Sequence, residues 1–199
     1  MMYIIKGEPV SKGIFGGKIT FYNRKKEHIE KRKIDHSEKE IQRFLEASEN
    51  AIGELQVLYE KSVKSVGQDN ALVFGIHQML IEDPEFVKGV CNIIRDEQVN
   101  AEYAIRLVFE QQSEALSKQK RADDMRDVCR RLVKILSGSE ENYFEAQEEI
   151  LLVADDLLPS EMMRMDAKKL AGIVLLEGNA NSHAAIFAKA MGISMVIRS

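Results

Sequence analysis

Apolar residues recur at helical spacing through the middle of this chain, whereas they gather in short runs near both ends. Between residues 37 and 137, they fall three or four positions apart in five successive segments. These segments are separated by residues typical of helix ends, among them Gly67, Pro84 and Gly138. The pattern predicts a bundle of about four or five antiparallel helices joined by short connections.

Capping residues predict where three of these helices begin. Ser37 and Glu40 have the spacing of a capping box, in which each side chain bonds the backbone amide of the other. Asp83 precedes Pro84, a residue suited to the first turn, and is expected to cap the third helix. Asn100 is expected to cap the fourth helix.

The two ends of the chain have the pattern of strands. Alternation predicts a half-buried strand at residues 18–22, and apolar runs predict buried strands at 150–154, 172–176 and 193–197. A short helix capped by Ser160 is expected after the second of these strands, and an alanine-rich helix after the third. Strands that alternate with helices indicate the α/β class.

The order of the elements makes the helical bundle an insertion. The strand near the N-terminus has no other sheet to join, so we expect it to pair with the C-terminal strands. The expected α/β subdomain is therefore discontinuous and consists of residues 1–24 and 146–199. The expected helical subdomain consists of residues 33–140.

Composition narrows the class of protein. With 45% hydrophobic and 30% charged residues, the chain can form a core and remain soluble, and its formal net charge of −4 argues against general nucleic-acid binding. Cys91 and Cys129 lie in helical patterns among apolar neighbours, which predicts buried thiols in a reducing compartment. Neither a run of about 18 apolar residues nor a signal peptide is visible, so we expect a cytoplasmic protein without a membrane span.

The segment that follows the strand at 172–176 carries the strongest candidate chemistry. Small and polar residues from Gly178 to Ser182 form a loop, and His183 stands where the loop becomes a helix. The first turn of a helix exposes unpaired amides and partial positive charge, which suit phosphate. A neutral imidazole has a lone pair that can attack phosphorus, and the Ser182 hydroxyl can hold the new charge. The plain alternative is a surface histidine or a partial cap.

Two acids are candidates for orienting this histidine. Asp155 and Asp156 follow the strand that precedes it in sequence, at the same kind of strand end as the His183 loop. The alternative is that both are solvated acids at the end of a strand. The spacing of His28 and His36 fits no common metal site, so no metal site is expected.

Several motifs together resemble those of phosphoenolpyruvate-utilising enzymes. The sequence Ser182-His183-Ala184-Ala185-Ile186-Phe187-Ala188-Lys189 is similar to the phosphohistidine motif of these enzymes. Other stretches resemble, in the same order, segments of Enzyme I of the bacterial sugar phosphotransferase system; they are 11–18, 74–83, 121–128 and 150–161. The resemblance runs through essentially the whole chain.

The resemblance implies a phosphocarrier with an α/β swivelling-type phosphohistidine domain and an inserted helical subdomain. Enzyme I takes the phosphoryl group of phosphoenolpyruvate on a histidine and passes it to a histidine of the small carrier HPr. By motif position, His183 is that histidine, and the helical subdomain docks HPr. The corresponding docking positions here are His77, Met79, Leu80 and Arg126. His77 lies beside the apolar stripe and is the better surface candidate, because Met79 and Leu80 can also be core residues.

The loop departs from the family pattern. Enzyme I usually has glycine, arginine and threonine before the Ser-His pair, where this chain has Asn179, Ala180 and Asn181. The missing arginine removes a cation that can bind phosphate through two hydrogen bonds. Gly178, Asn179 and Asn181 remain the candidate phosphate loop, but weaker phosphorylation of His183 or a variant pathway is expected.

The chain also ends at Ser199, before the phosphoenolpyruvate-binding barrel of the family, which needs Mg²⁺. We therefore expect a truncated α/β domain that binds no cofactor by itself and whose partners are an HPr-like carrier and that C-terminal domain. Alone, it is expected to take phosphate only backwards, from phosphorylated HPr.

Two alternatives to a phosphocarrier region of Enzyme I stay open. One is a partner-binding module whose degenerate loop has lost its chemistry. The other is the swivelling domain of a related phosphoenolpyruvate-utilising dikinase or synthase, which the long helical insertion disfavours.

Overall fold

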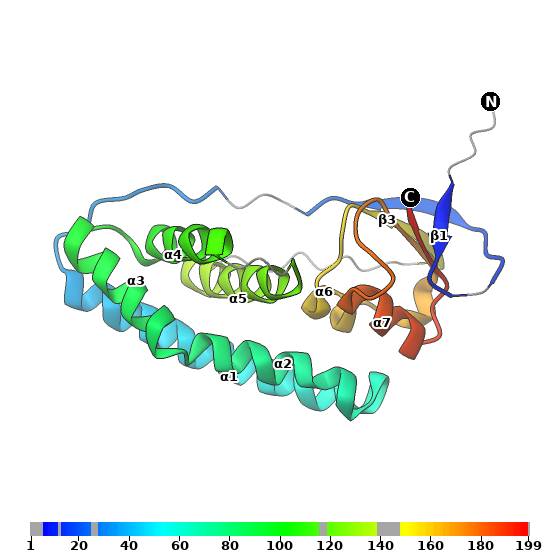
Figure 1. The fold of residues 1–199 in the computed structure, drawn as a ribbon, viewed down its shortest axis with the longest axis horizontal. Helices are drawn as coiled ribbons and strands as arrows, with labels where there is room; N and C mark the ends of the chain where they lie inside the picture. Colours follow the sequence, from blue (N-terminus) through cyan, green and yellow to red (C-terminus); the bar gives the residue numbers. More distant parts are fainter. Residues whose placement is uncertain (1–5, 12, 25–27, 116–118, 139–147, 199) are drawn as a thin grey trace. The chain divides into compact units, whose positions relative to one another are not determined.

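The computed structural model describes residues 6–11, 13–24, 28–115, 119–138 and 148–198 (Figure 1). The chain forms two compact units, each built from segments distant in sequence. The sheet unit consists of Met1–Lys25, Lys61–Ala71 and Asn142–Ser199, and the helical unit of Lys26–Glu60 and Leu72–Glu141. The boundaries predicted at residues 140 and 146 fall outside the described residues.

The sheet unit contains a five-stranded sheet with the order β1-β5-β4-β3-β2. Its strands are β1 (Gly7–Pro9), β2 (Lys18–Tyr22), β3 (Ile150–Ala154), β4 (Leu170–Leu175) and β5 (Met195–Arg198). Strands β2 to β5 pair in parallel, and β1 pairs antiparallel with β5. Both N-terminal strands are therefore edge strands of the C-terminal sheet, which confirms the predicted joining and the mixed helical and α/β class.

The carboxyl ends of three neighbouring strands lie in register. Tyr22 of β2 pairs with Ala154 of β3, which pairs with Leu175 of β4. Helix α6 (Pro159–Arg164) follows β3, helix α7 (His183–Ala190) follows β4, and the two helices contact each other. The segments that follow these strands therefore lie together at the carboxyl ends of the strands, where α/β folds usually bind ligands.

The start of α6 differs from the prediction. Ser160 is inside the helix rather than its cap, and Leu158 is the residue that precedes the first turn. The Leu158 amide donates a 2.8 Å hydrogen bond to the carboxylate of Glu161. A glutamate three residues into the helix thus does the capping, and Ser160 is buried.

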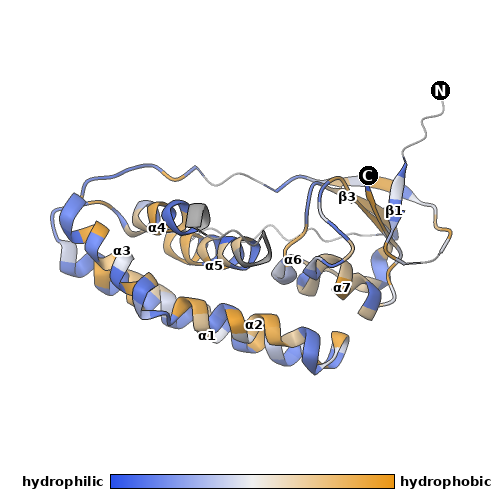
Figure 2. Ribbon diagram, in the orientation of Figure 1, coloured by the Kyte–Doolittle hydropathy of each residue, from blue (hydrophilic) through white to orange (hydrophobic). Residues whose placement is uncertain are grey.

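The five predicted helices form the helical unit, except that Lys61–Ala71, at the end of the first helix and the start of the second, belongs to the sheet unit. Polar and apolar residues are mixed along these helices (Figure 2). They are α1 (Ser37–Val66), α2 (Gln68–Ile81), α3 (Pro84–Glu97), α4 (Ala101–Ala115) and α5 (Gln119–Ser137). Gly67 and Gly138 follow α1 and α5 with φ angles of 85° and 60°. This left-handed backbone favours glycine and ends both helices as predicted.

Only one of the predicted helix caps forms locally. Asp83 accepts hydrogen bonds from the amides of Glu85 and Phe86, at 2.8 and 3.3 Å, which confirms the cap of α3. Asn100 precedes α4 as predicted, and its carbonyl accepts the Ala104 amide at 3.1 Å, but the side chains of Glu40 and Asn100 bind elsewhere. Glu40 accepts a 2.7 Å hydrogen bond from the Ala101 amide rather than closing a capping box, and the Asn100 amide oxygen accepts one from the distant Arg32 amide.

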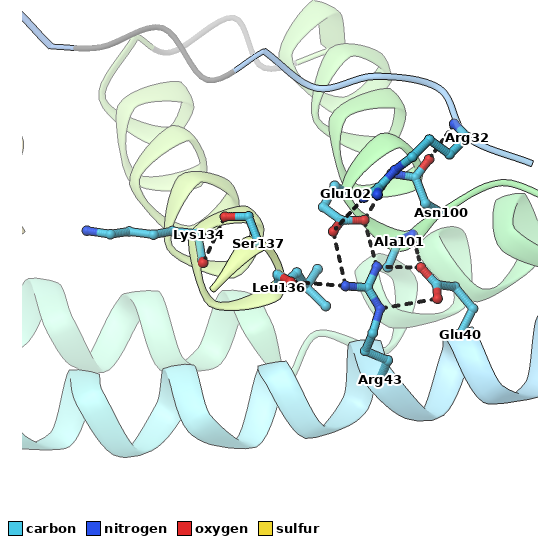
Figure 3. A network of polar contacts seen from close by, with 9 residues as sticks. All are labelled: Arg32, Glu40, Arg43, Asn100, Ala101, Glu102, Lys134, Leu136 and Ser137. Carbon is cyan, nitrogen blue, oxygen red and sulfur yellow. Dashed lines mark hydrogen bonds and ion pairs between the residues drawn. The ribbon is translucent and has the colours of Figure 1, made fainter. Parts of the chain in front are cut away.

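Arg43 explains why the Glu40 carboxylate is directed away from its own helix end (Figure 3). The Arg43 guanidinium binds the carboxylates of Glu40 and Glu102 at 2.5 and 2.7 Å, and donates to the Leu136 carbonyl at 3.1 Å. These contacts join the start of α1 and the start of α4 to the end of α5. Glu102 is buried, and burial raises its pKa, but the hydrogen bonds from Arg43, its backbone and Asn100 outweigh burial, so the pKa lies below its ordinary value.

Candidate functional site

The loop between β4 and α7 is a tight turn held by its own side chains. Gly178 has a φ angle of 120°, which a residue with a Cβ adopts only with strain. The Asn179 side-chain oxygen accepts a 2.9 Å hydrogen bond from the Asn181 amide, and its carbonyl accepts one of 3.0 Å from Ser182. Gly178 and Asn179 therefore shape the loop, which leaves Asn181 exposed at its tip.

The neighbouring strand end anchors the beginning of this loop. The Leu176 amide donates to the Ala154 carbonyl at 2.9 Å, and the Glu177 amide donates to the Asp155 carbonyl at 2.8 Å. The backbone that carries the two aspartates thus lies directly beside the histidine loop, as expected from the sequence.

Ser182 and His183 occupy the junction between loop and helix. Ser182 is the N-cap of α7, and its hydroxyl oxygen accepts a 3.3 Å hydrogen bond from the Ala185 amide. The first main-chain bond of the helix runs from Ile186 to the Ser182 carbonyl, at 3.0 Å. The amides between them belong to the first helical turn, where no intrahelical acceptor exists, and they provide the N–H groups that suit an anion.

His183 is the first residue of α7 and is only partly exposed. Its Nε2 atom is shielded from solvent. A phosphorus atom delivered by another protein can therefore reach Nε2 only after the ring turns or its cover moves.

The two aspartates have different environments. Asp155 is exposed, whereas Asp156 is half-buried and forms an ion pair with Arg24. Their orienting action on His183 stays a prediction.

Sequence patterns did not single out Arg24. Arg24 follows the last residue of β2 by two positions, and its side chain is 18% exposed. It binds Asp156 and both carboxylate oxygens of Glu161, at 2.8 Å from Nε and 2.5 Å from Nη2. Burial opposes the charge of Arg24, but Glu161 and Asp156 outweigh it and raise the pKa above its ordinary value. A cation two residues past a strand end, near a site at the same sheet edge, was the available signal.

In the helical unit, the surface position predicted for His77 is wrong. The His77 side chain is fully buried on α2, with Nε2 3.2 Å from Asp124 and Nδ1 3.9 Å from Asp127. The Phe74 ring packs edge-on against it, with centroids 6.0 Å apart. His77 therefore holds α2 to α5 and cannot contact a partner in this arrangement.

The opposite face of α2 is apolar and exposed. Leu72, Ile76 and Met79 are 51%, 46% and 70% exposed, although their spacing suggested core positions. Helix α2 has apolar residues on both faces, so hydrophobic spacing alone could not identify the buried one. Met79 remains a surface candidate, whereas Leu80 is only partly exposed.

Arg126 lies in the helical unit and is partly exposed. Its guanidinium is 3.3 Å from the carboxylate of Asp123, three residues earlier on α5, with both side chains about 40% exposed. The charge of Arg126 can thus face solvent while Asp123 holds the side chain in place.

Within the part of the chain that the structure describes, no group of three or more His, Cys, Asp or Glu side chains could hold a metal ion. In the same residues, every helix is too short or too polar to cross a bilayer.

Comparisons with known proteins place this geometry in a family. The sequence pattern described as "PEP-utilising enzyme, N-terminal" matches residues 6–127, and that of the "PEP-utilising enzyme, mobile domain" matches residues 146–199. The phosphoenolpyruvate-protein phosphotransferases of Haemophilus influenzae and Bacillus subtilis are 32% and 33% identical over 98% of this chain. The chain spans about a third of the length of these relatives, 35% and 36%.

Solved structures agree with the sequence matches. A solution structure of Enzyme I (nEIt) matches 98% of this chain and 82% of its own, with a TM-score of 0.76 and 35% identity. An N-terminal domain of Enzyme 1 - Nitrogen matches 98% of this chain and 83% of its own, with a TM-score of 0.65 and 25% identity. The chain belongs to the family of phosphoenolpyruvate-utilising enzymes and contains segments of their N-terminal and mobile domains.

Proposed function

We propose that the chain is the phosphocarrier region of an Enzyme I-type phosphotransferase, in which His183 accepts a phosphoryl group and passes it to a histidine of an HPr-type carrier. The observation that supports this most is His183 at the start of α7, behind a glycine turn, in a chain that matches the family along nearly its whole length. The phosphoryl group comes originally from phosphoenolpyruvate, which a domain outside this chain binds.

The transfer itself needs only the two imidazoles. A ring nitrogen of the acceptor attacks phosphorus, a new N–P bond forms, and the N–P bond of the donor breaks with its electron pair returning to the donor ring. Amides of the first turn of α7 and the Ser182 hydroxyl proton stabilise the phosphoryl oxygens. Gly178 and Asn179 keep the loop in the shape that presents them, and Asn181 adds an amide donor.

The carrier docks on the exposed apolar face of α2. Leu72, Ile76 and Met79 lie four and three positions apart and form a stripe of the kind that protein interfaces bury. Leu80 borders this stripe, and Arg126 supplies a positive charge that suits an acidic rim on the carrier. A soluble relay of this type belongs in the cytoplasm, which is where we place the chain. The Mg²⁺ requirement of the family belongs with the phosphoenolpyruvate-binding domain.

Phosphoryl acceptance is tested by incubating the chain with phosphorylated HPr-type carrier and measuring acid-labile phosphohistidine. We expect wild type and His28→Ala to become labelled, because His28 is an exposed histidine remote from the loop in sequence. We expect His183→Ala to carry no label. Equal labelling of His183→Ala and wild type would reject the proposed acceptor.

Docking is tested separately by titrating the chain with unphosphorylated carrier and following amide NMR shifts. Met79→Lys should weaken binding about tenfold or more, because it places a solvated charge in the apolar stripe. Ile19→Lys, at an exposed apolar position of the sheet unit, is the matched control and should bind as wild type does. If Met79→Lys binds the carrier as tightly as wild type does, the apolar face of α2 is not the docking surface.

A further inference from the structure

The loop that precedes His183 lacks a cation of its own. From Glu177 to Ser182 the chain contains no lysine or arginine, and its one charged residue is an acid. A phosphoryl group on histidine adds about one and a half to two negative charges near neutral pH, as other protein phosphoryl groups do. Positive charge that offsets it must come from the helix end or from another element.

Arg24 is held by several polar groups at the sheet edge where this loop begins. Its strand β2 is in parallel register with β3, whose last residue pairs with the last residue of β4. Its partner Asp156 is the residue after Asp155, whose carbonyl accepts the Glu177 amide. Its other partner, Glu161, belongs to α6, and α6 contacts the helix that begins at His183.

The geometry of the cluster restrains the guanidinium. Glu161 binds both Nε and Nη2 of Arg24, while Asp156 binds Nη1 through its carboxylate and Nη2 through its carbonyl, at 3.3 Å. The Tyr22 hydroxyl donates a 3.0 Å hydrogen bond to Glu161. A bidentate guanidinium between two carboxylates has little freedom to leave.

The charge balance of this cluster bears directly on the phosphoryl group. Replacement of the Arg24 guanidinium by a neutral group would make the surroundings of Asp156 and Glu161 more negative by one charge. Charges in a partly buried site interact more strongly than in water, and the interaction weakens as their separation grows. This added negative charge near the start of the loop would therefore disfavour a phosphorylated histidine.

We propose that Arg24 is a positioning residue of the phosphohistidine site, which neutralises Asp156 and Glu161 beside the arginine-free loop and so favours the phosphorylated form of His183. This inference rests on the proposed function, because it assigns a role within that same site. Arg24 acts through the two carboxylates and need not touch the phosphoryl group.

The test measures how the phosphoryl group partitions between the chain and phosphorylated HPr-type carrier at equilibrium. Arg24→Gln should reduce the fraction of phospho-His183 by on the order of tenfold in the equilibrium constant. It should also raise the pH midpoint of the ³¹P chemical shift, because a nearby cation that favours the dianion is lost. Arg24→Lys, which keeps the charge, should restore most of both quantities. The matched control is Lys18→Gln, at the other end of β2, where an exposed lysine pairs with Glu148; neither quantity should change.

Asp156→Asn gives a prediction of opposite sign. Removal of this negative charge should increase the phosphorylated fraction, whereas an acid that orients His183 would decrease it when removed. This variant also keeps the proposal testable if Arg24→Gln fails to fold, which circular dichroism detects.

Wild-type partition and a wild-type ³¹P midpoint in folded Arg24→Gln would overturn the proposal, as would a decreased phosphorylated fraction in Asp156→Asn. Wild-type chain that accepts no phosphoryl group at all would instead overturn the proposed function, so the two failures are distinguishable.

Discussion

The helical unit and the sheet unit use charged side chains in different ways. In the helical unit, His77, Glu102 and Arg131 are buried and link one helix to another. In the sheet unit, Arg24 and Asp156 keep partial exposure and gather where strands end, beside a loop with candidate chemistry. The first set holds helices together, whereas the second set lies where the chain enters the loop that carries His183.

The largest expected effect comes from removing the central cation of the helical unit. Arg43→Met should lower the free energy of unfolding by about 2–3 kcal/mol, because the buried Glu102 loses its shortest ion pair and keeps the longer one with Arg32, at 3.5 Å, and the hydrogen bond from Asn100. This is below the value for a fully buried pair, because Arg43 is 37% exposed and solvent screens part of its charge. Urea unfolding measures the change, and thiol labelling of Cys129, whose pKa burial raises, detects opening of the helical unit.

The matched control for Arg43 is Lys31→Met. Lys31 pairs with Glu97 at 2.9 Å, but both side chains are well exposed, so a much smaller change than for Arg43→Met is expected. Equal effects of the two variants would show that burial does not distinguish structural charges in this unit.

A glycine tests the packing of the sheet unit. A Cβ on Gly172 would collide with the Phe15 ring, so Gly172→Ala should destabilise the sheet by about 1–3 kcal/mol. Hydrogen exchange of peptides from β3 and β4 should rise, with little change in the helical unit. Gly16→Ala, where a Cβ meets nothing, is the control. If Phe15→Ala does not relieve the Gly172→Ala defect, the collision is not its cause.

Acid should affect the helical unit through Glu102. Its pKa in the folded protein lies below the ordinary value of 4.5, so the folded state binds fewer protons than the unfolded state between the two pKa values. The stabilisation is therefore present above pH 4.5 and is lost as pH falls through the folded pKa. As the pH is lowered from about 6 to about 3, the free energy of unfolding should fall more steeply for wild type than for Arg43→Met. If the two curves of unfolding free energy against pH are parallel, Arg43 is not the cause of this pH dependence.

The smallest effect is expected on an exposed helix. Gly53 lies within α1, and a Cβ there meets open space. Gly53→Ala should stabilise the helical unit by about 0.5–1 kcal/mol, because alanine loses less backbone entropy in a helix. A lower unfolding midpoint in urea would mean that Gly53 has a contact or a backbone requirement of its own.

Sequence patterns predicted the fold well where no distant residue binds the side chains or backbone involved. The strands at 18–22 and 150–154 match β2 and β3, and the cap at Asp83 and the ends at Gly67 and Gly138 are where the residues indicate. The junction of loop and helix at His183 is also where the sequence predicts it, because small and polar residues favour a loop and the alanines that follow favour a helix.

Long-range partners explain the failures. Glu40 and Asn100 have the right spacing to cap, yet Glu40 accepts a hydrogen bond from the Ala101 amide and Asn100 accepts one from the Arg32 amide, both distant in sequence. Helix α2 is apolar on both sides, so the burial of His77 and the exposure of Ile76 depended on which side α5 covers. Neighbouring residues could not predict the ion pairs of Arg24, since its two carboxylate partners are more than a hundred residues away.

The sequence by itself determined the elements, the inserted helical segment and the histidine with its glycine turn, because hydrophobic period, backbone freedom and capping are properties of neighbouring residues. Only the tertiary structure decided which charges are buried, which face of α2 is exposed to solvent, and that Arg24 lies at the carboxyl ends of the strands, where the His183 loop begins. Those choices depend on contacts between residues distant in the chain, where the free energy of a buried ion pair or a packed side chain exceeds any local preference.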